Sequence, residues 1–302
     1  MRIWLRLVCS AVFAVCGLAR ADDIDRRVVV GGRARTYTLH VPGANTNQHT
    51  PLPIVIALHG GDRQGRDMAE LSQFSQLAER EGFLVAYPDG LRAHWRDGRT
   101  MPPGMLEEDV DDVAFVDALL DDAATLKELD PRRIYATGFS NGGIFSHYLA
   151  LRKPERIAAI AAVAGGIAAE VSSQFKPAVP VSVLIIHGHS DSFVPYIGGQ
   201  LTSKHGSVVS AESAARLWLA ADGIRSQPLK RTIPAKSAGD CTEEWLSWSG
   251  GRGGSAVTLI SLGGGGHTWP GSKVSRPANG KVCPELNATR VIWDFFEQHP
   301  KP

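Results

Sequence analysis

The sequence predicts an α/β fold with a mostly parallel central sheet that is covered by helices on both faces. Three observations lead to this prediction. Uninterrupted apolar runs of strand length recur along the chain and end in glycine, as is typical of strands buried on both faces. Helix-like stretches lie between these runs, and alternating strands and helices favour a parallel sheet. The composition, with 43% hydrophobic and 21% charged residues, is that of a globular protein.

The apolar runs and the helical patterns predict the strands and helices along the chain. The apolar runs predict buried strands at residues 54–58, 83–87, 133–137 and 181–186. The helical patterns predict helices at residues 68–80, 113–129, 144–151, 211–221 and 289–298. Because no repeat or long polar linker divides these elements, we expect one domain.

A hairpin is predicted at each end of this series. Residues 28–30 and 37–41 flank Gly31 and Gly32, a pair that suits a two-residue turn. Residues 243–248 and 257–262 flank a glycine-rich turn ahead of the last helix. Both pairs of strands are expected to be antiparallel.

Charge and hydropathy exclude two classes of protein. The formal net charge is +1, without the basic excess that nucleic-acid binding usually requires. No apolar run approaches the roughly 18 residues that a membrane-spanning helix needs. We therefore expect neither a nucleic-acid partner nor a membrane span.

The first 21 residues predict a secretory signal peptide. Arg2 and Arg6 precede a short apolar stretch, and Ala19 and Ala21 fit a cleavage site of small residues. A buried N-terminal helix is the alternative, and a lipoprotein signal at Cys16 is disfavoured by the bulky residue before it. The prediction is a secreted protein, extracellular or periplasmic, with one catalytic domain over residues 22–302.

Two cysteines remain after cleavage, and they predict one disulfide. An even number of cysteines, Cys241 and Cys283, is left in a protein exported to an oxidising compartment, and this favours a disulfide between them. Two unpaired buried thiols are the alternative. Two cysteines this far apart make no zinc site by themselves, and no metal is expected.

Ser140 is the candidate nucleophile. It stands in the centre of G-x-S-x-G at residues 138–142, between the predicted strand at 133–137 and the predicted helix at 144–151. In such a turn the serine backbone is strained, and the flanking glycines let strand and helix pass closely. The turn also places Ser140 at the positive end of the helix, where an oxyanion is favoured. A structural turn serine is the alternative.

A base and an acid are expected later in the chain, in the order acid and then histidine. His267 follows a predicted strand and four glycines that can carry a loop across the end of the sheet, so it is the candidate general base. Asp191 follows the predicted strand at 181–186 and is the candidate acid, which holds the histidine tautomer. Less suitable by position are His147, His205 and His299 as the base and Asp240 as the acid.

Two backbone amides are expected to form the oxyanion hole. One is the N–H of Asn141, directly after the nucleophile. The other is the N–H of Gly61, with Gly60 and Asp62 as alternatives, because glycine lets the backbone approach a substrate closely.

Trp95 and Trp269 are the candidate substrate-binding side chains. Trp95 lies in a long segment, residues 91–108, that resembles neither helix nor strand, and such loops are often functional. Trp269 stands two residues after His267. The alternative is that both cover the core.

Several segments together resemble a known family. They are residues 59–61 (HGG), 87–90 (YPDG), 110–116 (VDDVAFV), 138–143 (GFSNGG), 187–191 (HGHSD), 194–196 (VPY) and 266–271 (GHTWPG). In this order they resemble the secreted polyhydroxybutyrate depolymerase and feruloyl esterase group of the α/β-hydrolase superfamily, from about Arg35 to His299. The resemblance implies the α/β-hydrolase fold and a triad of Ser140, Asp191 and His267. It does not select a substrate, because the group contains polyester depolymerases as well as feruloyl and acetyl-xylan esterases.

The sequence therefore predicts a secreted serine esterase that forms an acyl-enzyme and needs no cofactor. The two tryptophans favour phenolic or acetyl esters of the plant cell wall, as in a feruloyl esterase, and a hydroxybutyrate oligomer is the alternative substrate. A prolyl-type serine peptidase is a more distant alternative. A non-catalytic secreted binding module is another, but it expects a missing triad residue, and all three are present.

Overall fold

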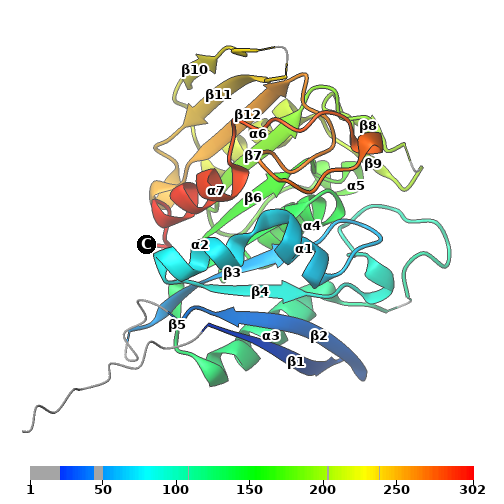
Figure 1. Ribbon diagram of the computed structural model, residues 1–302, viewed down its shortest axis with the longest axis vertical. Helices are drawn as coiled ribbons and strands as arrows, with labels where there is room; N and C mark the ends of the chain where they lie inside the picture. Colours follow the sequence, from blue (N-terminus) through cyan, green and yellow to red (C-terminus); the bar gives the residue numbers. More distant parts are fainter. Residues whose placement is uncertain (1–20, 44–49, 108, 203, 238) are drawn as a thin grey trace, which may run out of the picture.

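The computed structural model describes residues 21–43, 50–107, 109–202, 204–237 and 239–302. The predicted signal peptide, apart from Ala21, lies outside these residues. Within them, ten strands form one twisted sheet (Figure 1). Their order across the sheet is β1 (Asp22–Val30), β2 (Arg33–Val41), β4 (Leu84–Pro88), β3 (Leu52–Leu58), β5 (Leu129–Phe139), β6 (Ala159–Val163), β7 (Ser182–Gly188), β12 (Val257–Gly263), β11 (Thr242–Trp248) and β10 (Leu229–Ile233).

The centre of this sheet is parallel, and its apolar sequence explains why. Every neighbouring pair from β4 through β3, β5, β6 and β7 to β12 runs in parallel. All residues of β3, β4, β6 and β7 are buried, as expected for strands covered on both faces. The predicted fold class, an α/β-hydrolase fold with a mostly parallel sheet, is confirmed.

Antiparallel strands close the sheet at both edges. β1 and β2 form the predicted hairpin, and Gly31 and Gly32 have φ values of 57° and 76°, in the left-handed region that its turn requires. At the other edge β11 pairs antiparallel with β12, as predicted, and β10 extends the sheet by one more antiparallel strand. A separate small sheet pairs β8 (Gly199–Gln200) with β9 (Ser207–Val208).

Helices cover both faces of the large sheet (Figure 1). One face packs against α1 (Gly65–Ser72), α2 (Phe74–Glu81) and α7 (Ala288–Glu297), and the other against α3 (Asp112–Leu126), α4 (Asn141–Arg152) and α6 (Ala211–Asp222). Short helices complete the chain: α5 (Ala169–Ser172), η1 (Leu91–Ala93), η2 (Arg252–Gly254) and η3 (Pro277–Asn279). In the described part of the chain, no helix combines the length and apolarity needed to cross a membrane.

The structure differs from the sequence prediction in several elements. The helix expected at residues 68–80 is two helices, α1 and α2, because Gln73 adopts a left-handed conformation with φ of 55°. The strand β6 is absent from the prediction, since three of the five residues in AIAAV are alanine, which is depleted in strands. The exposed edge strand β10 was also not predicted, because its residues are largely polar and exposed.

Cys241 and Cys283 form the predicted disulfide, with Cα atoms 5.4 Å apart. Both cysteines are buried. The bond ties the residue directly before β11 to the segment that follows η3. It therefore joins two stretches that the sheet does not otherwise hold together.

Replacing both cysteines with serine is expected to lower the free energy of unfolding by about 3 to 4 kcal/mol, because a crosslink closing a loop of 42 residue steps restricts the unfolded chain. Urea unfolding of the variant and of the oxidised protein measures this difference. Reduction of the unmodified protein provides the control and should give a similar shift. Equal unfolding midpoints for oxidised protein and variant would contradict the expectation.

Candidate active site

The turn between β5 and α4 carries Ser140 in a strained conformation, with φ of 55° and ψ of −118°. The amide of Ser140 donates a hydrogen bond of 2.9 Å to the carbonyl of Val163 on β6. A Cβ atom at Gly142 would lie 2.3 Å from the carbonyl oxygen of Leu58, and one at Gly138 would lie 2.3 Å from that of Gly142. Both glycines of the G-x-S-x-G motif are therefore required by backbone packing.

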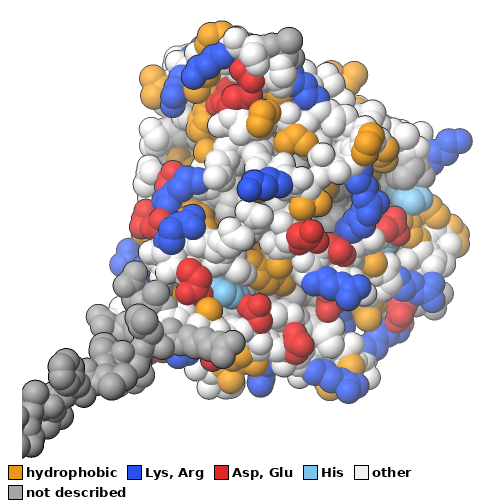
Figure 2. Space-filling view, in the orientation of Figure 1, with side chains coloured by type: hydrophobic (Ala, Val, Ile, Leu, Met, Phe, Trp, Pro, Cys, Tyr) orange, Lys and Arg blue, Asp and Glu red, His pale blue; other side chains and the backbone are white. Residues whose placement is uncertain are grey.

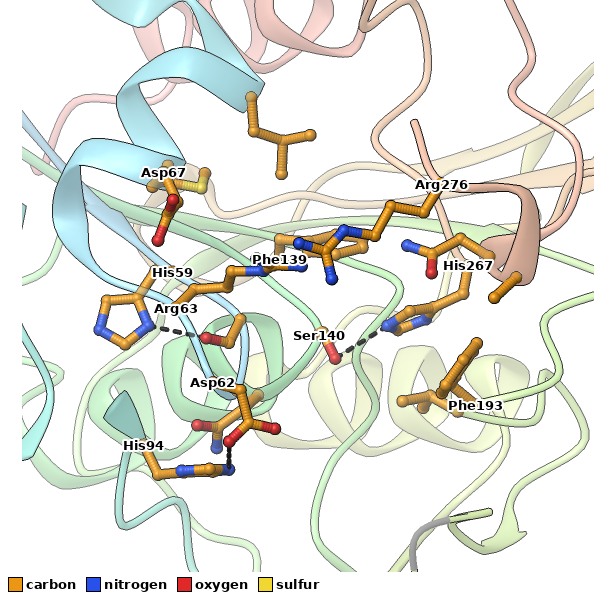
Figure 3. Close-up of a pocket in the computed structure, with 18 of the residues that line it drawn as sticks. His59, Asp62, Arg63, Asp67, His94, Phe139, Ser140, Phe193, His267 and Arg276 are labelled. Carbon is orange, nitrogen blue, oxygen red and sulfur yellow. Dashed lines mark hydrogen bonds and ion pairs between the residues drawn. The ribbon is translucent and has the colours of Figure 1, made fainter. Parts of the chain in front are cut away.

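Ser140, His267 and Asp191 form a continuous hydrogen-bonded chain. The hydroxyl of Ser140 donates to Nε2 of His267 at 2.9 Å (Figure 3). Nδ1–H of His267 donates to Oδ2 of Asp191 at 2.8 Å. The other carboxylate oxygen of Asp191 accepts the backbone amides of Phe193 and Val194 at 2.9 and 2.8 Å. The acid is thus fixed by its own loop and orients the imidazole toward the serine.

The parallel sheet explains why these three residues meet. β5, β7 and β12 run in the same direction, so the loops that follow them leave from one edge. The loops after β7 and β12 also bind each other. The amide of His189 donates to the carbonyl of Leu262 at 3.0 Å, and that of Ser190 donates to the carbonyl of Gly265 at 2.9 Å. Asp191 and His267 are consequently held side by side.

The environment of Asp191 keeps its carboxylate ionised. Burial opposes ionisation, but hydrogen bonding from His187 and His267 outweighs burial and holds the pKa of Asp191 well below its ordinary value. His187 donates from Nε2 to the carbonyl of Val194 at 2.8 Å, and the same nitrogen lies 3.4 Å from Asp191 Oδ2. A buried negative charge next to His267 favours the positively charged imidazole that forms when it accepts a proton.

The backbone amides around Ser140 offer hydrogen-bond donors to the cavity. In the described chain, the amides of Asn141, Gly61 and Gly60 have no acceptor, and all three residues line the cavity that contains Ser140. The amide of Asp62 donates instead to the carbonyl of Ala93 at 3.0 Å. The amides of Asn141, Gly61 and Gly60 are therefore available to a substrate oxygen, whereas that of Asp62 is already engaged.

His59 fixes the glycine segment of this region. Its Nε2 accepts the amide of Gly90 at 2.9 Å, and its Nδ1–H donates to the carbonyl of Gly60 at 2.7 Å. Burial lowers the pKa of His59 to about 4, so the ring is neutral at neutral pH. A neutral ring donates through one nitrogen and accepts through the other, as both contacts require.

The side chain of Asn141 anchors a second wall of the cavity. Its Oδ1 accepts the amide of Trp95 at 2.8 Å, and its Nδ2 donates to the carbonyl of Trp95 at 3.1 Å and to Oδ2 of Asp97 at 2.7 Å. Asp97 in turn forms an ion pair of 2.6 Å with Arg99, which donates to the carbonyl of His205 at 2.8 Å. This buried network holds the residue whose amide faces the cavity.

The structure does not bring the two predicted tryptophans to the cavity. Trp95 is fully buried, stacks on Phe145 with ring centroids 5.3 Å apart, and donates from Nε1 to the carbonyl of His59. Trp269 is 2% exposed and donates from Nε1 to the hydroxyl of Thr289. Neither lines the cavity of Ser140, so their role is packing, and the expected substrate contact is corrected.

Two phenylalanines flank the imidazole instead. The cavity has a volume of about 520 Å³, and Ser140 and His267 line it (Figure 3). The ring centroids of Phe139 and Phe193 lie 4.8 and 5.1 Å from that of His267, and Phe193 is 37% exposed. Neither phenylalanine is among the residues that the sequence predicts for the site, although each stands within two residues of a candidate catalytic residue.

Solved structures and curated sequences show the class of this protein. An acetyl xylan esterase from Aspergillus awamori superposes with a TM-score of 0.53 at 18% identity, covering 78% of this chain and 89% of that one. A thermostable esterase superposes with a TM-score of 0.57 at 15% identity, covering 93% and 64%. These likenesses establish the α/β-hydrolase fold, and the relatives below establish a carboxylic ester hydrolase.

The family follows from sequence. The family described as esterase PHB depolymerase matches residues 35–181. NocK from Nocardia uniformis subsp. tsuyamanensis, named as a candidate esterase, is 30% identical over 294 residues, covering 92% of this chain and 84% of NocK. Feruloyl esterase B from Piromyces equi is 28% identical over 255 residues, covering 83% of this chain but 42% of that longer protein. The chain belongs to the esterase PHB depolymerase family.

The buried contacts of Asn141 predict an unusual order of severity among its variants. Asn141→Asp is expected to lower both kcat and the free energy of unfolding more than Asn141→Ala, although aspartate is the closer isostere. The reason is that a second carboxylate would face Asp97 Oδ2, now a 2.7 Å partner of the amide nitrogen, at a cost of about 2 kcal/mol or more.

Ester hydrolysis and thermal unfolding measure both effects. Asn287→Asp is the matched control, because Asn287 is exposed and caps α7, where aspartate is equally suitable. A more active and more stable Asn141→Asp than Asn141→Ala would contradict the expectation.

Proposed function

We propose that the protein hydrolyses carboxylic esters through an acyl-enzyme, with Ser140 as nucleophile, His267 as general base and Asp191 as the orienting acid. The hydrogen-bonded chain of these three side chains, in which Ser140 and His267 line one cavity, is the observation that supports this most strongly. The amides of Asn141 and Gly61 are the proposed oxyanion hole.

Each step follows from these positions. Ser140 Oγ attacks the ester carbonyl as its proton passes to Nε2 of His267, and the negative oxygen is bound by the two amides. The bond to the alcohol oxygen then breaks, and the alcohol leaves with the proton from His267. Water next gives a proton to His267 and attacks the acyl carbon. The bond between the acyl carbon and Ser140 Oγ then breaks as His267 returns that proton to Oγ, which releases the acid. Loss of one oxyanion donor typically costs about a hundred- to a thousandfold in turnover.

We further propose that the enzyme is exported and acts outside the cytoplasm, as one catalytic domain over residues 22–302. The signal-like first 21 residues support this location. The disulfide between Cys241 and Cys283 supports it independently, because such bonds persist mainly in oxidising compartments. Basic and acidic side chains intermingle on the face shown in Figure 2, which does not favour a nucleic-acid partner.

Two substrate classes are proposed. Phenolic or acetyl esters of the plant cell wall are the first, supported by the likeness to feruloyl esterase B and by the rings of Phe139 and Phe193 beside His267. Hydroxyalkanoate oligomers are the second, supported by the family description and by two cavity arginines discussed below.

Ser140→Ala should reduce hydrolysis of p-nitrophenyl acetate by about a millionfold or to the limit of detection, since the variant lacks the nucleophile. Ser146→Ala is the matched control, because Ser146 lies on α4 and donates only to the carbonyl of Gly142. A fluorophosphonate should label the control and not Ser140→Ala. Substantial serine-independent turnover would refute the acyl-enzyme mechanism.

Methyl ferulate and the hydroxybutyrate trimer distinguish the two substrate classes. The class that fits the cavity should show the higher kcat/KM, because specificity is a ratio of these constants. Chromatography of the released acids provides the measurement, with Ser140→Ala as the blank. Turnover of neither compound, by an enzyme active on p-nitrophenyl acetate, would reject both classes.

A further inference from the structure

Two arginines extend into the active-site cavity from opposite walls (Figure 3). Arg63 follows the glycine segment after β3 and stands two residues beyond Gly61. Arg276 precedes η3, whose last residue, Asn279, accepts the amide of His267 at 2.7 Å. Both cations are thus attached to segments that also carry parts of the proposed catalytic machinery.

In the part of the chain that the structure describes, these two guanidinium groups have no acidic partner. Among the described residues, no carboxylate oxygen lies within 4.0 Å of a nitrogen of Arg63 or Arg276. By contrast, the third cavity arginine, Arg99, is paired with Asp97 at 2.6 Å. Arg99 therefore supports the wall of the cavity, whereas the charges of Arg63 and Arg276 are available to bind an anion.

The carboxylates that line the same cavity have other surroundings. Asp67 accepts the amide of Gln64 at 2.8 Å and so caps α1, where its charge is favoured by the helix dipole. Asp62 is 91% exposed at its side chain and lies 3.9 Å from Nε2 of His94. Glu70 is exposed.

The positive charges of Arg63 and Arg276 face one cavity and repel each other, and an anion placed between them relieves that repulsion.

We propose that Arg63 and Arg276 form a subsite for a carboxylate on the substrate, so that the preferred ester carries a free acid group at the end of its acyl or alcohol part. The planar fork of a guanidinium matches a carboxylate better than any other side chain does. A hydroxyalkanoate oligomer has such an acid end, whereas a feruloyl ester has a neutral phenol. The inference rests on the proposed esterase function and selects between its two substrate classes.

Two pairs of esters that differ only in charge test the subsite. The first pair is the hydroxybutyrate dimer as free acid and as carboxamide, with the charge on the alcohol part. The second is monomethyl glutarate and its carboxamide, with the charge on the acyl part. We expect the wild type to prefer the acid in at least one pair by about fivefold in kcat/KM, mainly through KM. Hydrolysis of the carboxamides by wild type, and its loss in Ser140→Ala, tests the esterase function separately.

The double variant Arg63→Gln with Arg276→Gln should abolish the preference for the acid, so that the ratio of kcat/KM for acid and carboxamide falls by about fivefold to near one. Arg66→Gln with Lys273→Gln is the matched control, because it removes the same charge from exposed neighbours that do not line the cavity. Added salt should weaken the wild-type preference, which tests the subsite even if the double variant is unstable. Two results would overturn the proposal. One is that the wild type hydrolyses acid and carboxamide at equal rates in both pairs, and the other is an undiminished preference for the acid in the double variant.

Discussion

The common direction of β5, β6, β7 and β12 is the constraint on which the site depends. Ser140, Asp191 and His267 are far apart in the sequence, and they meet because each follows a parallel strand that ends at the same edge of the sheet. The register of β7 and β12 places Gly188 opposite Leu262, so the acid loop and the histidine loop start at the same height. A strand inserted between β7 and β12 would separate Asp191 from His267 by about 5 Å, beyond hydrogen-bond distance.

Backbone hydrogen bonds between loops hold His267 in place beyond the end of the sheet. The histidine loop has little regular structure, yet its backbone is fixed: the amides of Gly266 and His267 donate to the carbonyls of Lys281 and Asn279 at 2.9 and 2.7 Å. Cys283 stands two residues beyond Lys281 and is linked to Cys241 directly before β11. The disulfide therefore fastens to the sheet the same segment that supports His267. This placement gives the bond a positioning role in addition to its effect on the unfolded chain.

The sequence indicates those parts of the site that backbone packing dictates. Gly138 and Gly142 leave no room for a Cβ atom, so the G-x-S-x-G motif is visible in the sequence. The order of buried strands then locates Asp191 and His267. Side-chain direction leaves no such mark: Trp269 stands two residues after His267 in the sequence, but its indole turns inward and donates to the hydroxyl of Thr289. The network of Asn141 was equally unpredictable, because an asparagine at a variable motif position has no assignable partner until Asp97 is placed beside it.

The two sides of the cavity differ in how firmly they are held. On one side, Asn141, Asp97 and Arg99 are buried and bind one another through hydrogen bonds and an ion pair. This wall is therefore fixed by the packing of the fold, and it carries the backbone amide proposed to bind the oxyanion of any ester. On the other side, Arg276 and Phe193 are exposed and lie on loops. Loops tolerate substitution because few buried contacts depend on them. A side chain on this second wall can therefore change without disturbing the strained turn at Ser140.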